Sequence, residues 1–306
     1  MLRYTFFIMK KLFLLLSVAG MLMTACGPID DGTGNENGNG NGNQNQQPGS
    51  GNQGGGEDVP ADKTKAIKFQ DEHTKLLCIL LWDDNEDGEL SYEEAAAVTD
   101  LGSTFKGSAV IAFSELEYFT SLKKIANSAF KGCVGLIKIT LPKQITSIGE
   151  EAFSECTNLK KIDIPDSVTL IDKSAFSKCS SLTSVTIGNG VTEIGWWAFQ
   201  GCTSLASVTI GNSVTEIGDY AFYECKKLTS VTIPNSVTSI GQLAFCDCSR
   251  LQEVYCKATT PPTGGKYMFD GAPEQKKIYV PAESAKTYKS ATGWSRYASN
   301  IVGYDF

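Results

Sequence analysis

Oxygen-bearing side chains recur at alternating positions of one short acidic segment, and oxygen is the donor atom that hard cations prefer. Residues 83–94 read DDNEDGELSYEE, and Gly88 stands where a 12-residue loop must turn sharply. Loop positions 1, 3, 5, 7, 9 and 12 hold the candidate ligands Asp83, Asn85, Asp87, Glu89 (through its carbonyl), Ser91 and Glu94. Such spacing is what a seven-coordinate calcium ion requires. The segment therefore predicts a calcium-binding loop.

The loop resembles an EF-hand or dockerin-type calcium loop, and its flanks agree with that resemblance. Apolar residues within 69–81 fit one stripe of an incoming helix, and residues 93–98 suit an outgoing helix. Sensor EF-hands usually occur in pairs, whereas one loop is visible here, so we expect a structural calcium ion rather than a switch. An acidic surface turn without metal is the alternative. His73, on the incoming helix, is interpreted as a tolerated surface or core residue and not as a ligand.

The chain beyond this loop repeats with a period of 23 residues. A fixed period in this range is the signature of a solenoid. The repeating cysteines are Cys133, Cys156, Cys179, Cys202, Cys225 and Cys248. In the unit that starts at Leu182, a short strand is expected to point Val185 and Ile187 inward, and Phe199 and Cys202 are expected to close the coil. One coil cannot bury this apolar set alone, but stacked coils share one continuous core.

Two motifs of the repeat, C-x-x-L-x-x-V-x-I and I-G-x-x-A-F, resemble the 23-residue, BspA-like class of bacterial leucine-rich repeats over about residues 114–257. The resemblance implies an α/β solenoid, a leucine-rich-repeat ribbon of short parallel strands. It implies a small helical calcium-binding cap before the repeats, over residues 61–113, and a strand-helix cap after them, over residues 258–306. Residues 100–125 are interpreted as a degenerate first coil.

The cysteine ladder allows two interpretations. Neighbouring cysteines on stacked coils come within plausible Cα range of a disulfide, yet parallel Cβ vectors about 4.8 Å apart fit disulfide geometry poorly. We therefore expect small, buried free thiols that act as weak S–H donors. Zinc is not expected, because collinear thiols cannot surround a tetrahedral ion. Cys246 and Cys256 fall outside the ladder and are not assigned a role.

The N-terminal residues 1–26 have the features of an export signal. Residues 10–25 read KKLFLLLSVAGMLMTA, which combines two lysines, an apolar run and small residues just before Cys26. The ending Met23-Thr24-Ala25-Cys26 resembles a bacterial lipobox, although Met23 stands where leucine is usual. This resemblance implies that Cys26 is acylated; an ordinary cleaved signal is the alternative.

A polar segment at residues 27–60 separates the signal from the loop. It is rich in Gly, Asn and Gln, a composition with too little apolar surface to offset the entropy of ordering. We expect a disordered tether there. Asp30-Asp31 resembles the acidic export tag of surface-facing lipoproteins. These features predict a protein of the outer membrane that faces the cell exterior and touches the membrane through its lipid anchor only.

One outward column of the repeat changes character along the chain. The two residues before each Ala-Phe pair are polar in early coils, as in Glu150-Glu151 and Lys173-Ser174. Later coils place large apolar groups in the same column, and such groups indicate a recognition surface. The candidate ligand patch consists of Trp196, Trp197, Tyr220, Tyr223 and Leu243. Packing of these side chains over the convex side, or a contact between copies, is the alternative.

The composition argues against two classes of protein, nucleic-acid-binding proteins and enzymes. The net charge of −7 argues against a nucleic-acid partner, which needs a basic face. One histidine in the chain and no phosphate-binding loop leave few catalytic chemistries, so no enzyme is expected. The BspA-like resemblance implies adhesion to a host extracellular protein or a bacterial surface protein. Glycan capture by the tryptophans and a structural scaffold without external ligand are the alternatives.

Overall fold

The structure is a computed structural model, and it describes residues 62–306. The predicted signal peptide with the lipidation site Cys26 (residues 1–26) and the predicted linker (residues 27–60) lie outside the described residues. Among residues 62–306, no helix has the length and the apolar character needed to cross a lipid bilayer.

Two short helices precede the repeats, α2 (Glu72–Trp82) and α3 (Tyr92–Ala97). Asp71 begins α2, because its carboxylate accepts hydrogen bonds from the backbone N–H of His73 at 3.2 Å and from the hydroxyl of Thr74 at 2.8 Å. The same carboxylate accepts a hydrogen bond from the backbone N–H of Ile111 at 2.8 Å. The buried Asp71 thus joins the start of α2 to the first coil.

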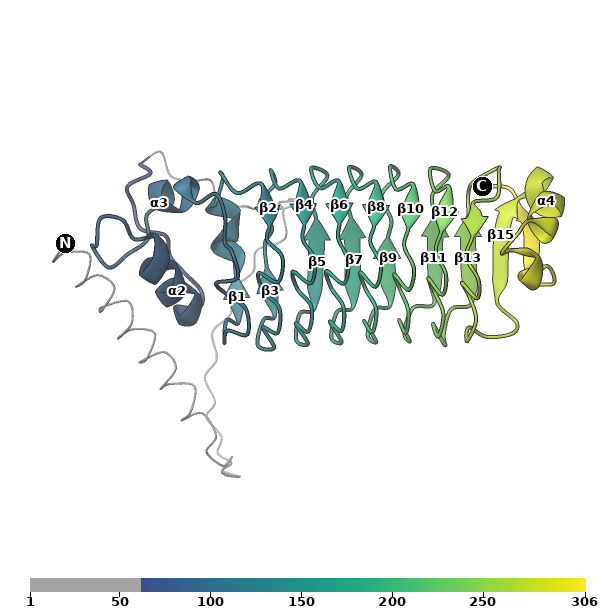
Figure 1. Cartoon of the computed structure of the whole chain (residues 1–306), viewed down its shortest axis with the longest axis horizontal. Coiled ribbons are helices and arrows are strands. Elements are labelled where there is room, and N and C mark those ends of the chain that lie inside the picture. Colours follow the sequence, from purple (N-terminus) through teal and green to yellow (C-terminus); the bar gives the residue numbers. More distant parts are fainter. Residues whose placement is uncertain (1–61) are drawn as a thin grey trace, which may run out of the picture. The chain divides into compact units, whose positions relative to one another are not determined.

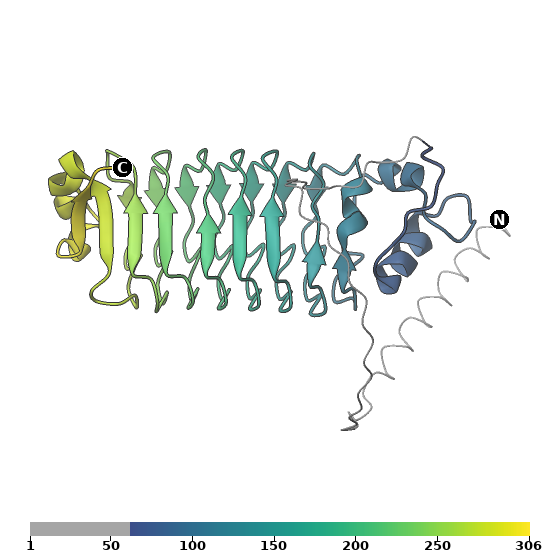
Figure 2. The same ribbon diagram turned by 180° about the vertical axis from the view of Figure 1, so that it is seen from behind.

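The coils form two ladders of short parallel strands (Figure 1). One ladder is a seven-stranded sheet of β2 (Lys124–Ile125), β4 (Ser147–Ile148), β6 (Leu170–Ile171), β8 (Glu193–Ile194), β10 (Glu216–Ile217), β12 (Ser239–Ile240) and β14 (Thr263–Gly264). The other ladder is divided into three sheets. The first pairs β1 (Ala112–Phe113) with β3 (Lys138–Ile139), and the second holds β5 (Lys161–Ile164), β7 (Ser184–Ile187) and β9 (Ser207–Thr209). The third holds β11 (Ser230–Ile233), β13 (Glu253–Cys256), β15 (Lys277–Pro281) and β16 (Ile301–Tyr304). The reverse view shows the same strands side by side in chain order (Figure 2). The predicted solenoid of short parallel strands is confirmed.

The first coil is irregular, as the sequence predicts for residues 100–125. A 3-10 helix, η1 (Ser114–Tyr118), lies between its two strands β1 and β2. These strands still pair in parallel with β3 and β4 of the next coil. The irregular coil therefore joins both ladders and provides the surface on which the regular coils stack.

The inward side chains of the repeat form one core that runs through the coils. In the coil that starts at Leu182, the residues predicted to point inward or close the coil are buried, namely Val185, Ile187, Phe199 and Cys202. Leu182, Val191 and Ile194 of the same coil are buried with them. The phenylalanines of successive coils stack face to face, with 5.1 Å between the ring centroids of Phe153 and Phe176 and again between Phe176 and Phe199. This ring spacing is close to the separation of hydrogen-bonded strands. The 23-residue period therefore reproduces the same packing contact from coil to coil.

The described cysteines are all free and buried, which confirms the prediction of free thiols. Each ladder thiol donates a hydrogen bond to the backbone carbonyl of a phenylalanine in the preceding coil. The thiol of Cys179 lies 3.1 Å from the carbonyl oxygen of Phe153, and that of Cys202 lies 3.2 Å from the carbonyl oxygen of Phe176. Burial raises the pKa of the Cys202 thiol well above its ordinary value, so the thiol keeps its proton. The phenylalanine carbonyl also accepts the backbone N–H of the cysteine in its own coil, at 3.3 Å from Cys179 to Phe176, so the thiol supplies a second donor to a buried oxygen.

The repeat continues beyond residue 257, into the segment expected to be a cap. β14 extends the seven-stranded sheet, and Phe269 stacks on Phe245 with ring centroids 5.6 Å apart. The chain then forms β15, the 3-10 helix η2 (Ala282–Ser284), α4 (Ala285–Ser290), the 3-10 helix η3 (Ser295–Tyr297) and β16. Trp294 and Tyr297 are buried, and the indole N–H of Trp294 donates to the carbonyl of Pro262 at 2.8 Å. This segment (yellow) closes the end of the stack in both views (Figures 1 and 2).

The two cysteines outside the ladder also have places in the structure. Cys256 lies on the last regular strand, β13, with its sulfur 3.3 Å from the hydroxyl of Tyr288 on α4. Cys246 is buried at a turn beside Asp247. Cys256 therefore belongs to the contact between the last coils and the C-terminal segment.

The Cys202→Ala substitution tests the role of the ladder thiols. It removes the second donor to the buried carbonyl of Phe176, which keeps its hydrogen bond from the backbone N–H of Cys179, so we expect a loss of about 0.5–1.5 kcal/mol in the free energy of unfolding, measured by urea denaturation. The matched control is Ser207→Ala on the exposed face of β9, which is expected to change stability by less than about 0.5 kcal/mol. Equal stability of the two variants would contradict the role assigned to the thiol.

Candidate binding surface and calcium loop

Each coil has two positions with a positive backbone φ, and one of the two is never glycine. This position is the second of the two residues before the Ala-Phe pair, and we refer to the set as the turn column: Ser128, Glu151, Ser174, Trp197, Tyr220, Leu243 and Tyr267, with φ from 55° to 62°. The left-handed conformation directs the backbone N–H of Trp197 to the carbonyl of Asp219 in the next coil, at 2.9 Å. The fold therefore fixes the backbone of the turn column and leaves its side chains to vary.

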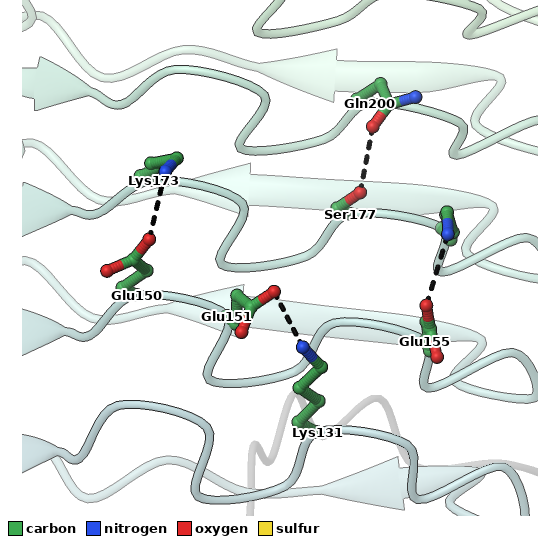
Figure 3. Close-up of polar contacts among 8 residues, drawn as sticks. Lys131, Glu150, Glu151, Glu155, Lys173, Ser177 and Gln200 are labelled. Atoms are coloured by element: carbon green, nitrogen blue, oxygen red, sulfur yellow. Dashed lines mark hydrogen bonds and ion pairs between the residues drawn. The ribbon is translucent and has the colours of Figure 1, made fainter.

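In the early coils, polar pairs that link neighbouring coils occupy this surface (Figure 3). Lys131 binds Glu151 with 2.7 Å between Nζ and Oε1, and Lys173 binds Glu150 at 3.2 Å. Exposed ion pairs of this kind contribute little stability each. They do show that the turn forms with charged or small polar side chains at this position and does not require an aromatic ring.

The later coils place aromatic rings on the same surface, and the structure brings the predicted patch together. The rings of Trp197 and Tyr220 stack, with centroids 5.6 Å apart and planes 27° apart. Trp196 meets Trp197 edge to face at 6.3 Å, and Tyr223 meets Tyr220 edge to face at 5.7 Å. Leu243 follows in the next coil, where the N–H of Tyr220 donates to the carbonyl of Gln242 at 2.9 Å. We call these five residues the aromatic face: Trp196, Trp197, Tyr220, Tyr223 and Leu243.

Polar groups hold the rings of the aromatic face in place. The ammonium group of Lys173 lies 5.6 Å from the ring centroid of Trp197, within the range of a cation–π contact. The side-chain amide of Gln242 donates to the hydroxyl of Tyr220 at 3.4 Å. A hydrogen bond to Asp247, together with desolvation, raises the pKa of Tyr223 to about 12, so its hydroxyl is neutral at physiological pH.

Tyr267 belongs to the same column and was missed by the sequence analysis. It has a φ of 62° and is 45% exposed, and the guanidinium of Arg296 lies 4.8 Å from its ring centroid. The step from Leu243 to Tyr267 is one residue longer than the repeat, which moves Tyr267 out of a fixed 23-residue alignment. Aligning Tyr267-Met268-Phe269 with Leu243-Ala244-Phe245 would have revealed it.

Local conformational preference does not account for the aromatic face. A bulky residue with φ near +57° is unfavourable, and the same slot is filled by serine or glutamate in the early coils. Trp196 is 51% exposed, so much of its ring is not used in packing. Bulky residues held in an unfavourable backbone conformation, here Trp197 and Tyr220 beside the exposed indole, tend to mark functional sites. The aromatic face is therefore the strongest candidate for a binding surface.

The acidic loop at residues 83–94 has backbone contacts that orient its odd-numbered side chains. The N–H of Gly88 donates to the Asp83 carboxylate at 3.0 Å, and the N–H of Asp87 donates to the Asn85 side-chain oxygen at 2.8 Å. Gly88 has a φ of 86°, which supports a sharp turn at loop position 6. Glu89 pairs with Lys75 at 2.8 Å through its side chain, which is not the group assigned to a metal ion.

Two observations bear on whether this loop fits a calcium ion. Oδ1 of Asp83 is buried and has no hydrogen-bond partner, and a buried, unpaired carboxylate oxygen is unfavourable unless a cation lies beside it. Against this, both oxygens of Glu94 accept hydrogen bonds, from the N–H of Asp84 and from the Ser91 hydroxyl among others. Among residues 62–306, no three acidic, histidine or cysteine side chains converge on one point. The oxygen donors suit calcium in chemistry, but their side chains do not converge in this structure, and calcium binding stays a prediction.

The loop has a backbone partner where paired EF-hands have a second loop. The N–H of Ile67 donates to the carbonyl of Leu90 at 2.8 Å, and Ala66 forms an antiparallel bridge with Ser91. The N–H of Tyr92 donates to the carbonyl of Lys65 at 3.2 Å. A short segment just before α2 therefore supports the single loop. His73 lies outside the loop, with its side chain 45% exposed.

The parallel ladders, the stacked phenylalanines and the thiol column define a solenoid of leucine-rich repeats. The profile of the BspA type leucine rich repeat region matches the sequence in six copies, over residues 103–229 and 171–293. These residues make up more than half of the chain, and the chain belongs to this family. Solenoids of this kind are typically non-enzymatic binding scaffolds.

Several solved structures are similar to this chain. A leucine rich cell surface protein from Faecalibacterium prausnitzii A2-165 is 26% identical, with a TM-score of 0.46, covering 61% of this chain and 62% of that one. The T. pallidum leucine rich repeat protein is 37% identical, with a TM-score of 0.43, covering 45% of this chain and 65% of that one. In both comparisons the chain spans less than two thirds of its relative. No curated protein matches the sequence.

Calcium binding is tested by thermal denaturation of the purified chain with calcium and with EDTA. A ligand that binds only the folded state at 100 times its Kd adds about 2.7 kcal/mol, so we expect calcium to raise the Tm by several degrees. Asp83→Asn should abolish the rise, because it removes the ligand whose second oxygen is unpaired. Asp84→Asn is the matched control, since this exposed loop residue is not a predicted ligand. The same Tm with calcium and with EDTA would contradict a metal site.

Proposed function

We propose that this protein is a lipid-anchored adhesin of a bacterial surface that binds a host extracellular protein or a bacterial surface protein through the aromatic face. The observation that carries the proposal is a run of partly exposed rings on and beside a turn column that earlier coils fill with polar residues, with Trp196 half-exposed. Exposed aromatic side chains on a rigid scaffold are typical of hot spots in protein interfaces. Family membership supports a binding role, because repeat solenoids present extended surfaces to partners.

The acidic residues of the early coils do not support a catalytic role. Glu150 and Glu151 are neighbours in sequence but bind different lysines, Lys173 and Lys131, on opposite sides of their coil (Figure 3). A catalytic pair would need two carboxyl groups that face a common reactant. These glutamates instead link the coils, which agrees with a scaffold that binds rather than reacts.

The anchor and the calcium ion complete the proposal. Acylation of Cys26 would hold the protein at the outer membrane, and residues 27–60 would lift the solenoid toward the cell exterior. Calcium in the loop at residues 83–94 would be structural, because this loop leads directly into α3 and the first coil. Support for the calcium proposal comes from the unpaired oxygen of Asp83.

Glycan capture is the second candidate function, and one observation favours it. The indole of Trp196 is 51% exposed and stands edge to face against Trp197, which leaves a ring face open for a sugar ring. Protein adhesion uses the whole aromatic face, whereas a glycan would depend on the tryptophans. The two candidates therefore differ in their response to substitution of single rings.

Loss of the tryptophans tests the proposed surface. The Trp196→Ala/Trp197→Ala variant should bind its target at least about 30-fold more weakly, the effect of a hot spot of 2 kcal/mol or more. Binding is measured by surface plasmon resonance against a panel of extracellular matrix proteins, bacterial surface proteins and glycans. The matched control is Thr186→Ala/Thr209→Ala, which changes two exposed residues of β7 and β9.

The outcome of the panel decides among the candidate functions. A protein target that loses affinity with the tryptophans supports adhesion, and a glycan target that does so supports glycan capture. Equal binding by the tryptophan variant and the threonine variant would refute the aromatic face as the site. Absence of any target would favour a structural scaffold.

Metabolic labelling with a radioactive or clickable fatty acid tests the anchor. The full chain expressed in a bacterium should incorporate the label and fractionate with the outer membrane. Cys26→Ser removes the acceptor thiol and should abolish labelling, whereas Cys78→Ser, at a buried cysteine of α2, should not. Label in the Cys26→Ser variant would show that Cys26 is not the acylated residue.

A further inference from the structure

Two glutamates lie directly opposite each other on neighbouring strands beside the aromatic face. Glu193 on β8 pairs in register with Glu216 on β10, and both side chains are exposed. Like charges directly opposite each other on a sheet are destabilising. Desolvation raises the pKa of Glu193, and the charges of Glu216 and Asp172 raise it further. We call Glu193 and Glu216 the acidic pair.

The acidic pair is not neutralised within the described part of the chain. The residues in register on either side are Leu170 and Ser239, neither of which is basic. The glutamates of the early coils differ, because Glu150 and Glu151 each bind a lysine. Across residues 62–306, neither carboxylate of the acidic pair forms an ion pair or a hydrogen bond. The repulsion therefore has no compensation in the fold.

The acidic pair adjoins the most exposed ring of the aromatic face. Glu193 lies three residues before Trp196 in the chain. In the next coil, Glu216 lies three residues before Asp219, which occupies the position equivalent to Trp196. The indole of Trp196 lies over Gly218, because a Cβ built on this glycine would be 2.7 Å from Cδ1 of the ring. The ring therefore leans onto the turn that directly follows Glu216. The exposed indole therefore lies next to the end of the strand that carries Glu216.

Rings of the turn column already bind cations within this protein. The ammonium group of Lys173 lies 5.6 Å from the ring centroid of Trp197, and the guanidinium of Arg296 lies 4.8 Å from that of Tyr267. Both contacts use a long aliphatic stem that lays a charged head on a ring. Trp196 has no such cation over it among the recorded contacts of residues 62–306, although its ring is the more exposed.

We propose that Trp196 and the acidic pair form a subsite for an arginine or lysine side chain of a protein partner. The stem would pack on the indole and the cationic head would meet the two carboxylates, which offsets their repulsion. A bare divalent ion fits less well, because no third acidic, histidine or cysteine side chain converges there among the described residues. The net charge of −7 would also steer a basic segment toward the protein. The subsite rests on the proposed function and names its partner as a basic protein segment.

The test uses a fluorescein-labelled peptide of four Gly-Arg-Ser units and its counterpart in which citrulline replaces arginine. Fluorescence anisotropy should show binding of the arginine peptide to the wild-type chain, weakened by added salt, and no binding of the citrulline peptide. Glu193→Gln/Glu216→Gln should weaken binding at least about 10-fold, which corresponds to 1.4 kcal/mol. Glu274→Gln/Glu283→Gln removes the same charge from exposed residues of the C-terminal segment and should bind as the wild type does.

A stability measurement separates a binding role from a structural one. If the acidic pair is kept for binding, Glu193→Gln/Glu216→Gln should be as stable as the wild type or more so in urea, since it removes a repulsion. Lower stability of this variant would overturn the proposal. So would equal peptide binding by both double variants, or failure of the arginine peptide to bind the wild type.

Failure of this inference is distinguishable from failure of the proposed function. A panel target that is lost with Trp196→Ala/Trp197→Ala but kept with Glu193→Gln/Glu216→Gln would leave the aromatic face as the site and refute the cationic subsite. A target that neither variant affects would refute the aromatic face itself.

Discussion

Hydrogen bonds between the backbones of successive coils are the interaction on which the rest of this structure depends. Each coil must present its peptide groups to the next coil at strand spacing, so equivalent residues have to recur at a fixed step. The backbone N–H of Phe199 reaches the carbonyl of Ala221 at 2.7 Å, and Phe176 and Phe222 make the same contact with their next coils. The phenylalanine rings stack in this register. Each ladder cysteine thiol donates to a phenylalanine carbonyl of the preceding coil.

This register constrains the inward residues and the backbone of the turns, but not the outward side chains. The turn column shows the difference, because one left-handed turn carries Ser174 in one coil and Trp197 in the next. Early coils use this freedom for ion pairs between coils, and later coils use it for rings and unpaired carboxylates. A uniform scaffold can in this way carry a local binding surface, with the stability supplied by the core and the specificity by a few exposed residues.

The fold was predictable from the sequence because burial repeats with the period. The 23-residue spacing alone predicts that Val185, Ile187 and Cys202 are buried. It also predicts that Trp197 and Tyr220 lie side by side on neighbouring coils. Features outside the period were not predictable. Tyr267 follows a longer step, and the partner of the acidic loop is a short segment around Ile67 with no motif of its own. The opposition of Glu193 and Glu216 required the strand register, and calcium binding depends on a side-chain arrangement that spacing does not fix.

If the partner binds the aromatic face and not the strand face of the ladder, binding should protect the aromatic turns. Hydrogen–deuterium exchange, measured by mass spectrometry on the chain alone and in complex with its target, reports this protection peptide by peptide. We expect slower exchange on binding at the turns that hold Trp196, Trp197 and Tyr220, with no change at β7 and β9. Slower exchange confined to β7 and β9, with the aromatic turns unchanged, would contradict binding at the aromatic face.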